Sequence, residues 1–219
     1  MTNSLEKALL TLLLSFVATA AVVAQNMFKE FVNIKDIDST IVVDLMYAKA
    51  DNFVGEKMYN FSEAYLHPSA ARAVKKANTL LQKSNPHLRL IIYDAARPMR
   101  VQQKMWNKVK GTRQQNYVSN PANGGGLHNY GLAVDVSIID SKGDTLPMGT
   151  VVDALTPLSH IDNETALVKA GRLTSEAQRN RELLRRVMRE AGFRPLRSEW
   201  WHFNYTTRAN ARANYKVIP

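Results

Sequence analysis

A histidine and an aspartate occur seven residues apart in GGGLHNYGLAVDVSII, residues 124–139, and both residue types bind metals and transfer protons. His128 follows three consecutive glycines, and Asp135 lies between Val134 and Val136 in an otherwise apolar run. An isolated carboxylate is strongly destabilised in an apolar interior unless a partner offsets its charge. The pattern therefore predicts that Asp135 has such a partner.

A divalent cation is the partner that this pattern favours. In a strand over residues 132–139, Ala133, Asp135 and Ser137 share one face, opposite the apolar face that packs into the core. Small neighbours leave room for an ion beside Asp135 on the floor of a cleft. A histidine nitrogen together with a carboxylate oxygen suits zinc, and two such ligands require a third from elsewhere in the chain.

The segment SEWWHFNY, residues 198–205, offers the missing groups. His202 is the candidate third ligand, and Glu199 is the candidate base. Two histidines, one aspartate and an open fourth position are typical of a catalytic zinc site, in which the metal acidifies a bound water and a carboxylate accepts its proton. Because residues three apart in a regular strand face opposite sides, Glu199 must lie on a bend or bulge before the strand proper. The alternative is a core strand in which Trp200 and Trp201 pack, and both interpretations can hold if the tryptophans wall the site.

The segment YDAARPMR, residues 93–100, adds a candidate for electrostatic stabilisation. Arg97 ends a predicted buried strand and precedes a proline that suits the first turn of a helix. A fixed guanidinium there can stabilise the oxyanion that forms when water attacks a peptide carbonyl. The alternative is a structural salt bridge to Asp94 or another acid, and the zinc constellation favours the catalytic interpretation.

The elements that must position these residues mix strands and helices without a regular alternation. Predicted strands cover residues 41–48, 88–93, 132–139 and 199–205. Predicted helices begin at Pro68, Pro98 and Ser175, which forms a capping-box pattern with Gln178, and the last helix ends at Gly192. The basic run RNRELLRRVMRE, residues 179–190, is interpreted as the solvated face of that helix. This mixture predicts an α+β fold with a mainly antiparallel sheet, and the long predicted loop over residues 111–131 is typical of a functional site or a mobile segment.

The N-terminal segment, residues 1–24, is predicted to be a signal peptide, which leaves residues 25–219 as one catalytic domain. Lys7 precedes an apolar run of 17 residues that ends in small residues, a pattern typical of a secretory signal cleaved after Ala24. A retained membrane anchor is the alternative, because 17 apolar residues are close to the lower length limit of a spanning helix. No second stretch of that length occurs.

The cysteine content and the net charge limit which binding partners and which cellular compartment are expected. The chain has no cysteine, so it contains no disulfide, thiol nucleophile or thiolate zinc site, and an exported chain of this kind indicates a periplasmic location. The formal net charge of +10 is compatible with nucleic acid, anionic lipid or a cell-wall polymer. The basic residues are spread along the chain, however, and no zinc-finger or RNA-binding signature occurs. We expect no nucleic-acid partner and no membrane contact beyond the N-terminal segment.

The motif G-L-H-x-x-G-x-A-x-D at residues 126–135, followed by E-x-W-H at residues 199–202, resembles the zinc D-alanyl-D-alanine dipeptidases and their wider group of metallopeptidases. Three further segments are similar to that family: DLMYAKADNFVGEKMY (44–59), DAARP (94–98) and PMGTVVDALTPLSH (147–160). The first of them resembles the N-terminal signature of the dipeptidase branch. The resemblance extends from about residue 34 to about residue 207.

This resemblance implies one Zn²⁺ ion per chain, bound by His128, Asp135 and His202. It implies that Glu199 is the catalytic base, that Arg97 stabilises the transition state, and that Asp153 lies near the free amino terminus of the substrate. The implied reaction is hydrolysis of D-alanyl-D-alanine, or a similar short D-amino-acid dipeptide, by metal-bound water. The implied fold is a small antiparallel sheet flanked by helices, with the zinc site in a cleft on the sheet.

One position departs from the family pattern, and two alternative functions stay open. A serine is common two residues before the first metal histidine, whereas this chain has Gly126, so a hydroxyl that could touch the end of the substrate is missing. A zinc D,D-carboxypeptidase or endopeptidase that trims peptidoglycan stem peptides would need an open groove where a dipeptidase needs a closed end. A non-catalytic cell-wall-binding zinc module has no need of a base such as Glu199. The sequence makes no prediction of the oligomeric state.

Overall fold

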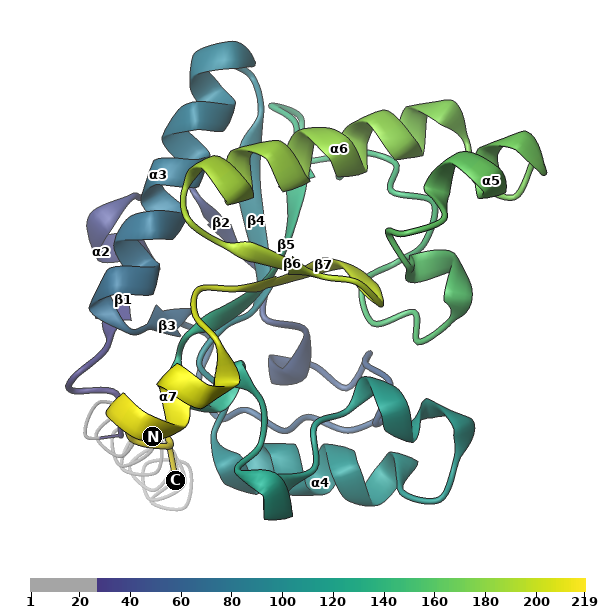
Figure 1. Cartoon of the computed structure of the whole chain (residues 1–219). Coiled ribbons are helices and arrows are strands. Elements are labelled where there is room, and N and C mark those ends of the chain that lie inside the picture. The colour runs from purple at the N-terminus through teal and green to yellow at the C-terminus, as the bar shows by residue number, and fades with distance from the viewer. Residues whose placement is uncertain (1–26) are drawn as a thin grey trace, which may run out of the picture.

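The computed structural model describes residues 27–219, and the predicted signal peptide, residues 1–24, lies outside the described residues. The main sheet has five strands in the order β2-β4-β5-β7-β6 (Figure 1). These strands are β2 (Val42–Val43), β4 (Arg89–Asp94), β5 (Ala133–Ile139), β6 (Arg194–Leu196) and β7 (Glu199–Asn204). Strand β2 runs parallel to β4, and each of the other neighbouring pairs is antiparallel. The predicted α+β fold with a mainly antiparallel sheet is confirmed.

Helices flank this sheet. Helix α6 (Ser175–Glu190) lies on one side of it together with α3 (Pro68–Ser84), and α4 (Met99–Val109) lies on the other side (Figure 1). Buried residues recur at helical spacing on α3 and α6 and join one core with the strands: Val74, Ala77, Leu81, Leu184, Val187 and Met188. Because residues on both sides cover β5, all seven of its residues are buried, including Asp135.

The smaller elements complete the chain. Strands β1 (Val32–Asn33) and β3 (Tyr65–Leu66) form a separate antiparallel pair. The short helices are α2 (Ile34–Ile37), α5 (Glu164–Lys169) and α7 (Arg208–Asn214). Short 3₁₀ turns are η1 (Met46–Ala48), η2 (Arg113–Tyr117), η3 (Pro121–Asn123), η4 (Leu127–Tyr130) and η5 (Pro157–Ser159). The predicted loop at residues 111–131 therefore contains three successive turns.

The predicted strand at residues 41–48 is largely wrong. Only Val42 and Val43 are in the sheet, and a 3₁₀ turn follows from Met46. The amide of Asp44 still donates to the carbonyl of Ile92, but the chain then leaves the sheet. The carbonyl of Tyr47 accepts hydrogen bonds from two amides, at residues 58 and 59, so a contact with a later segment overrides the local β propensity.

Two predictions about α6 are also wrong in detail. The N-cap is Thr174, whose hydroxyl accepts a hydrogen bond from the amide of Ala177, and Ser175 is the first helical residue. The basic run at residues 179–190 is solvated at several positions, but Arg181 is fully buried. Its guanidinium is satisfied by groups far away in the sequence, which the local pattern cannot reveal.

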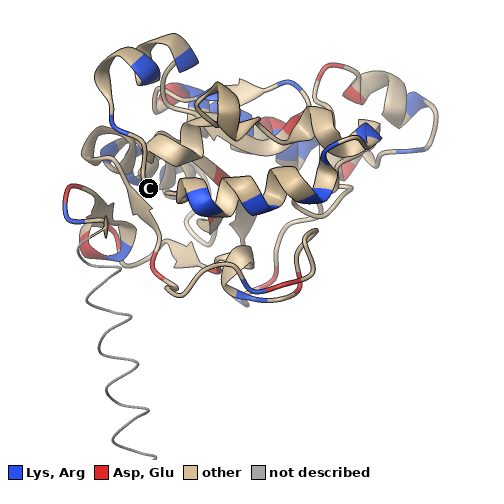
Figure 2. Cartoon of the chain, turned by 90° about the horizontal axis from the view of Figure 1, so that it is seen from below, with Lys and Arg blue, Asp and Glu red and all other residues tan. Residues whose placement is uncertain are grey.

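The remaining surface carries its charges in a distributed way. Lysine and arginine occur on several helices and loops, interspersed with aspartate and glutamate (Figure 2). Among residues 27–219, no helix is both long enough and apolar enough to cross a membrane.

Candidate functional site

Three of the predicted residues converge at the centre of the sheet. His128 comes from η4, and Asp135 of β5 lies directly opposite His202 of β7 in the antiparallel pairing. One ligand atom from each residue lies within 4.8 Å of the other two. Gly131 ends η4 with a φ of 64°, and a Cβ there would lie 2.5 Å from the ring of Phe31, so glycine permits the sharp entry into β5.

The hydrogen bonds on the outer side of both imidazoles fix which nitrogens face inward. Nδ1 of His128 lies 2.7 Å from the carbonyl oxygen of Ala95, and Nε2 of His202 lies 2.9 Å from Oδ1 of Asn204, so both nitrogens donate outward. The inward nitrogens, Nε2 of His128 and Nδ1 of His202, are 3.1 Å apart. They lie 3.3 and 3.0 Å from the carboxylate oxygens of Asp135. Three lone-pair groups thus point at one another, which is stable only with a cation or a proton among them.

The charges around Asp135 agree with such a site. Burial opposes ionisation of Asp135, but His128 and His202 hold the pKa of this carboxyl well below its usual range. Burial lowers the pKa of His128, and the charges of Asp135 and Asp94 reverse this effect and raise it above its ordinary value. Two nitrogen donors, one carboxylate and outer partners that orient the rings fit zinc among the divalent metals. The carboxylate in the apolar strand therefore has partners suited to a shared cation.

Glu199 lies beside this cluster at an irregularity in the pairing, as predicted, but inside the strand and not before it. It is the first residue of β7, where the pairing with β6 shifts register, and its carboxylate is 3.9 Å from Nδ1 of His202. This irregularity lets residues 199 and 202 face the same cavity, although residues three apart in a regular strand would face opposite sides. Burial raises the pKa of Glu199 to about 8, the charges of Asp135 and Asp153 add to the shift, and His202 and Arg97 oppose it. A metal cation at the neighbouring ligands would lower this pKa again.

These groups line one cavity of about 490 Å³. Its lining includes every residue that was predicted from the sequence to act in catalysis, metal binding or substrate binding. Those residues are Arg97, His128, Asp135, Asp153, Glu199 and His202. The lining does not include Trp200 or Trp201, so the prediction that the tryptophans wall the site is wrong. Trp200 lines a neighbouring cavity, and Trp201 is buried in the core.

Arg97 forms the ion pair with Asp94 that the structural interpretation predicted, and it also lines the cavity. Its Nε and Nη2 donate to Oδ2 of Asp94 at 2.8 and 2.5 Å, and Nη1 donates to Oε1 of Gln102 at 3.0 Å. Its Nη2 also lies 3.8 Å from Oδ2 of Asp135, and the guanidinium lies 5.2 Å from the ring centre of Tyr47. The ion pair with Asp94 therefore exists, and it orients a guanidinium that faces the cavity.

Asp153 reaches the cavity from the segment between β5 and α5. The hydroxyl of Tyr47 donates to Oδ2 of Asp153. Burial raises the pKa of Asp153 to about 7, and the charge of Asp135 adds to this shift, while the bond from Tyr47 and the charge of Arg97 oppose it. Tyr47 was not predicted as a site residue, because a strand was expected at residues 41–48 where a 3₁₀ turn directs this side chain into the cavity.

A serine from another segment occupies the space beside Gly126. A Cβ built on Gly126 would lie 3.0 Å from Oγ of Ser119, and both residues line the cavity. Oγ of Ser119 accepts a hydrogen bond of 2.8 Å from Nη2 of Arg208, which lines the cavity as well. A hydroxyl is therefore present near this point although residue 126 has no side chain. This contact could not be predicted from the sequence, because the turn η3 separates Ser119 from Gly126.

Comparison with known proteins is consistent with this geometry. Residues 27–218 match the model of a peptidase family, M15, that is described as D-Ala-D-Ala dipeptidase. A D-alanyl-D-alanine dipeptidase of Escherichia coli (strain K12) is 34% identical over 174 residues, which cover 80% of this chain and 83% of that protein. Proteins of the same name from Synechocystis sp. and Enterococcus faecalis are 27% and 24% identical, over 69% and 73% of this chain and 73% and 83% of their own lengths.

Proposed function

The chain belongs to the M15 family of D-Ala-D-Ala dipeptidases, a family of metallopeptidases, and on this premise we propose that it is a zinc-dependent dipeptidase. The proposed substrate is D-alanyl-D-alanine or a similar short D-amino-acid dipeptide. The observation that carries the proposal is the convergence of two imidazole nitrogens and a carboxylate beside Glu199 in one cavity. That arrangement supplies ligands and a base together, which a non-catalytic binding module has no use for.

His128, Asp135 and His202 would bind the ion. A zinc ion held there would supply Lewis-acid chemistry: it would polarise the peptide carbonyl and acidify the attacking water. Glu199 accepts the proton of the attacking water on its carboxylate and then delivers it to the amino group of the leaving amino acid. Its burial and its place 3.9 Å from His202 support this role.

Arg97 stabilises the negative charge that develops on the carbonyl oxygen. Its bonds to Asp94 and Gln102 fix the guanidinium before the substrate arrives, so little reorganisation is needed during the reaction. Asp94 is itself fixed by the hydroxyl of Tyr59 at 2.6 Å. The buried network therefore serves as the support of a catalytic cation.

The two charged ends of a free dipeptide have complementary groups in the cavity lining. Asp153 would pair with the ammonium, since a desolvated ammonium requires a carboxylate partner. Arg208, together with the hydroxyl of Ser119, would bind the terminal carboxylate. The contact between Tyr47 and Asp153 closes the lining where a longer peptide would continue, which favours a dipeptidase over a carboxypeptidase or endopeptidase.

We also propose that the enzyme is exported and acts on peptides of the periplasm or cell wall. The support for export is the signal-like pattern of residues 1–24. N-terminal sequencing of the protein recovered from the periplasmic fraction should start at Gln25. Recovery in the membrane fraction with Met1 retained would instead support an anchor.

A substrate panel tests the proposed activity directly. The zinc-loaded protein should hydrolyse D-Ala-D-Ala, and it should hydrolyse L-Ala-L-Ala, N-acetyl-D-Ala-D-Ala and a muropeptide pentapeptide much more slowly. Faster release of D-alanine from the pentapeptide would establish a carboxypeptidase instead. Lack of turnover of every peptide, with zinc bound, would favour a binding module.

A further inference from the structure

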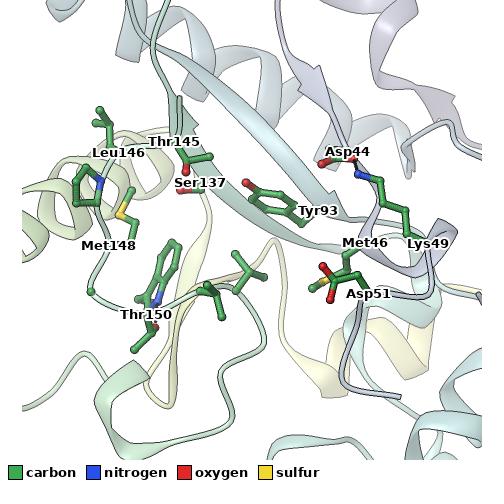
Figure 3. Close-up of a pocket in the computed structure, with 15 residues that line it drawn as sticks. Asp44, Met46, Lys49, Asp51, Tyr93, Ser137, Thr145, Leu146, Met148 and Thr150 are labelled. Atoms are coloured by element: carbon green, nitrogen blue, oxygen red, sulfur yellow. Dashed lines mark hydrogen bonds and ion pairs between the residues drawn. The ribbon is translucent and has the colours of Figure 1, made fainter. Parts of the chain in front are cut away.

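A second cavity of about 590 Å³ adjoins the metal cavity. One of its walls is formed by Asp44, Met46, Lys49 and Asp51, and the opposite wall by the segment that includes Leu146, Met148 and Thr150 (Figure 3). Consecutive residues line different cavities: Met46 and Val152 face this one, whereas Tyr47 and Asp153 face the metal cavity. The hydrogen bond between Tyr47 and Asp153 therefore joins the two segments into a partition between the cavities.

The backbone of this partition requires support from outside. Among the described non-glycine residues, Asp153 alone has a positive φ, of 60°. A non-glycine residue persists in that conformation only when its surroundings determine it. The segment that bears Asp153, residues 148–158, is not part of the sheet, so its position depends on contacts with other elements.

Arg181 of α6 supplies such contacts on both sides of Asp153. Its Nε donates to the carbonyl oxygen of Met148 at 2.7 Å, and its Nη2 donates to the carbonyl oxygen of Leu158 at 3.1 Å. These two carbonyls lie five residues before and five residues after Asp153. The guanidinium also lies 5.7 Å from the ring centre of Trp200, whose indole nitrogen donates to Oγ1 of Thr150 in the same segment.

Arg181 and Arg185 both form an ion pair with Glu164, so this ion pair does not distinguish Arg181 from Arg185. Its Nη1 lies 3.3 Å from Oε1 of the buried Glu164, but Arg185 also binds Glu164 through both oxygens, at 2.9 and 2.6 Å. The charge of Glu164 is therefore offset without Arg181. The two bonds to the backbone of residues 148–158 come from Arg181 and not from Arg185.

We infer that Arg181 is a positioning residue that sets the length of peptide the enzyme accepts. By fixing residues 148–158 from both ends, it keeps Asp153 against Tyr47 and the partition closed, so the metal cavity accommodates a dipeptide. When the segment is released, the second cavity becomes continuous with the first and can accept residues that precede D-Ala-D-Ala in a longer peptide. The inference rests on the proposed pairing of Asp153 with the substrate ammonium.

The test compares three variants of the zinc-loaded enzyme on two substrates, D-Ala-D-Ala and the tripeptide L-Ala-D-Ala-D-Ala. Arg181→Met removes the guanidinium, and Arg181→Lys keeps a buried cation beside Glu164 but cannot bind both carbonyls as a planar fork. Arg185→Met is the matched control, because it disrupts an ion pair with the same glutamate and leaves residues 148–158 untouched.

Both Arg181 variants should raise KM for D-Ala-D-Ala by about ten- to a hundredfold, the equivalent of one lost charge-assisted hydrogen bond, with a smaller change in kcat. Their kcat/KM for the tripeptide relative to the dipeptide should rise by at least about tenfold. Amide hydrogen exchange in residues 148–158 should accelerate in the same variants. Arg185→Met should leave the substrate ratio and this exchange at wild-type values.

A purely structural role of Arg181 gives a different result. It would lower kcat for both substrates in proportion, at unchanged KM, because fewer molecules would be folded. A proportional fall of kcat for both substrates in Arg181→Lys, at unchanged KM and native zinc content, would overturn the inference. If Arg181→Met does not fold, the kinetics of Arg181→Lys alone are the test. Equal turnover of dipeptide and tripeptide by the wild-type enzyme would instead contradict the proposed dipeptidase function itself, before any variant is made.

Discussion

Two clusters of buried charge in this protein are built in opposite ways. On α5 and α6, Glu164 is bound by Arg181 and Arg185, so one acid meets two permanent cations. Around the cavity, the carboxyl groups of Asp135, Asp153 and Glu199 lie near one another, and the pKa values of Asp153 and Glu199 are raised to about 7 and about 8, largely by burial. In the first cluster every charged group has a partner within the protein, whereas the second requires added cations.

This difference indicates what each cluster does. A complete buried network fixes the backbone around it, as Arg181 does for residues 148–158. A buried excess of carboxylates is destabilising in the free protein and becomes favourable when a metal ion or a substrate ammonium enters. We therefore expect substitution of Glu164 in the first cluster to change mainly stability, and substitutions in the second cluster to change binding and catalysis directly; Arg181 also acts on substrate binding, through residues 148–158.

The largest effect should come from removal of the metal. A chelator should abolish turnover of D-Ala-D-Ala, and added zinc should restore it, because the cavity loses the cation that its excess of carboxylates requires. Elemental analysis should find about one zinc per chain before chelation. Far-UV circular dichroism should change little, because α5 and α6 do not depend on the metal. Full activity of the metal-free protein would contradict the account.

Glu164→Gln is the corresponding change in the complete cluster. It leaves Arg181 and Arg185 without their buried counter-charge, so the free energy of unfolding should fall by about 3–5 kcal/mol. Denaturant titration measures this loss. At temperatures where the variant is folded, zinc content should be native and kcat close to wild type. A selective loss of zinc would mean that the two clusters are not separable.

Arg97→Ala should act mainly on the reaction. Removal of one donor to the developing oxyanion typically lowers kcat by about 10²- to 10³-fold. Zinc content should stay native, because Arg97 is not among the three ligands. Arg97→Lys is the matched control for the ion pair with Asp94 and should recover folding more than activity. If Arg97→Ala only loses stability, with no specific kinetic defect, the structural salt bridge is the whole role of this residue.

The smallest predicted effect is a pH dependence of substrate binding. Asp153 is neutral below its pKa of about 7 and ionised above it, so its attraction for the substrate ammonium should grow as pH rises. KM for D-Ala-D-Ala should therefore fall on raising the pH through the neutral range. A bound metal offsets the charge of Asp135 and moves the midpoint to about pH 7 or lower. Asp153→Asn should abolish this dependence and raise KM; a wild-type slope in that variant would remove Asp153 from substrate binding.

The sequence predicted those parts of the site that follow strand periodicity. Asp135 and His202 are on strands whose apolar patterns were clear, and the odd spacing of Glu199 and His202 correctly demanded an irregularity in β7. His128 could be placed because a glycine-rich segment leads directly into β5. These predictions depend on residues that are close in sequence to the elements that position them.

The groups that complete the cavity and its support could not be predicted in this way. Tyr47 faces Asp153 because its segment leaves the sheet. Ser119 fills the space beside Gly126. Arg181 is buried and donates hydrogen bonds to the carbonyls of residues 148 and 158. Each depends on a contact between segments far apart in the chain. A helical arginine has the same local pattern whether it faces solvent or a distant carbonyl.

The most direct test of the account compares zinc content and kcat in Glu199→Ala and His202→Ala. His202→Ala removes a ligand, so zinc affinity should fall sharply. Glu199→Ala leaves all three ligands, so zinc should stay at near-native occupancy while kcat falls by about 10²- to 10⁴-fold through loss of proton transfer, with a smaller change in KM. If Glu199→Ala loses zinc as His202→Ala does, then Glu199 supports the metal and is not the base, and the proposed mechanism is wrong.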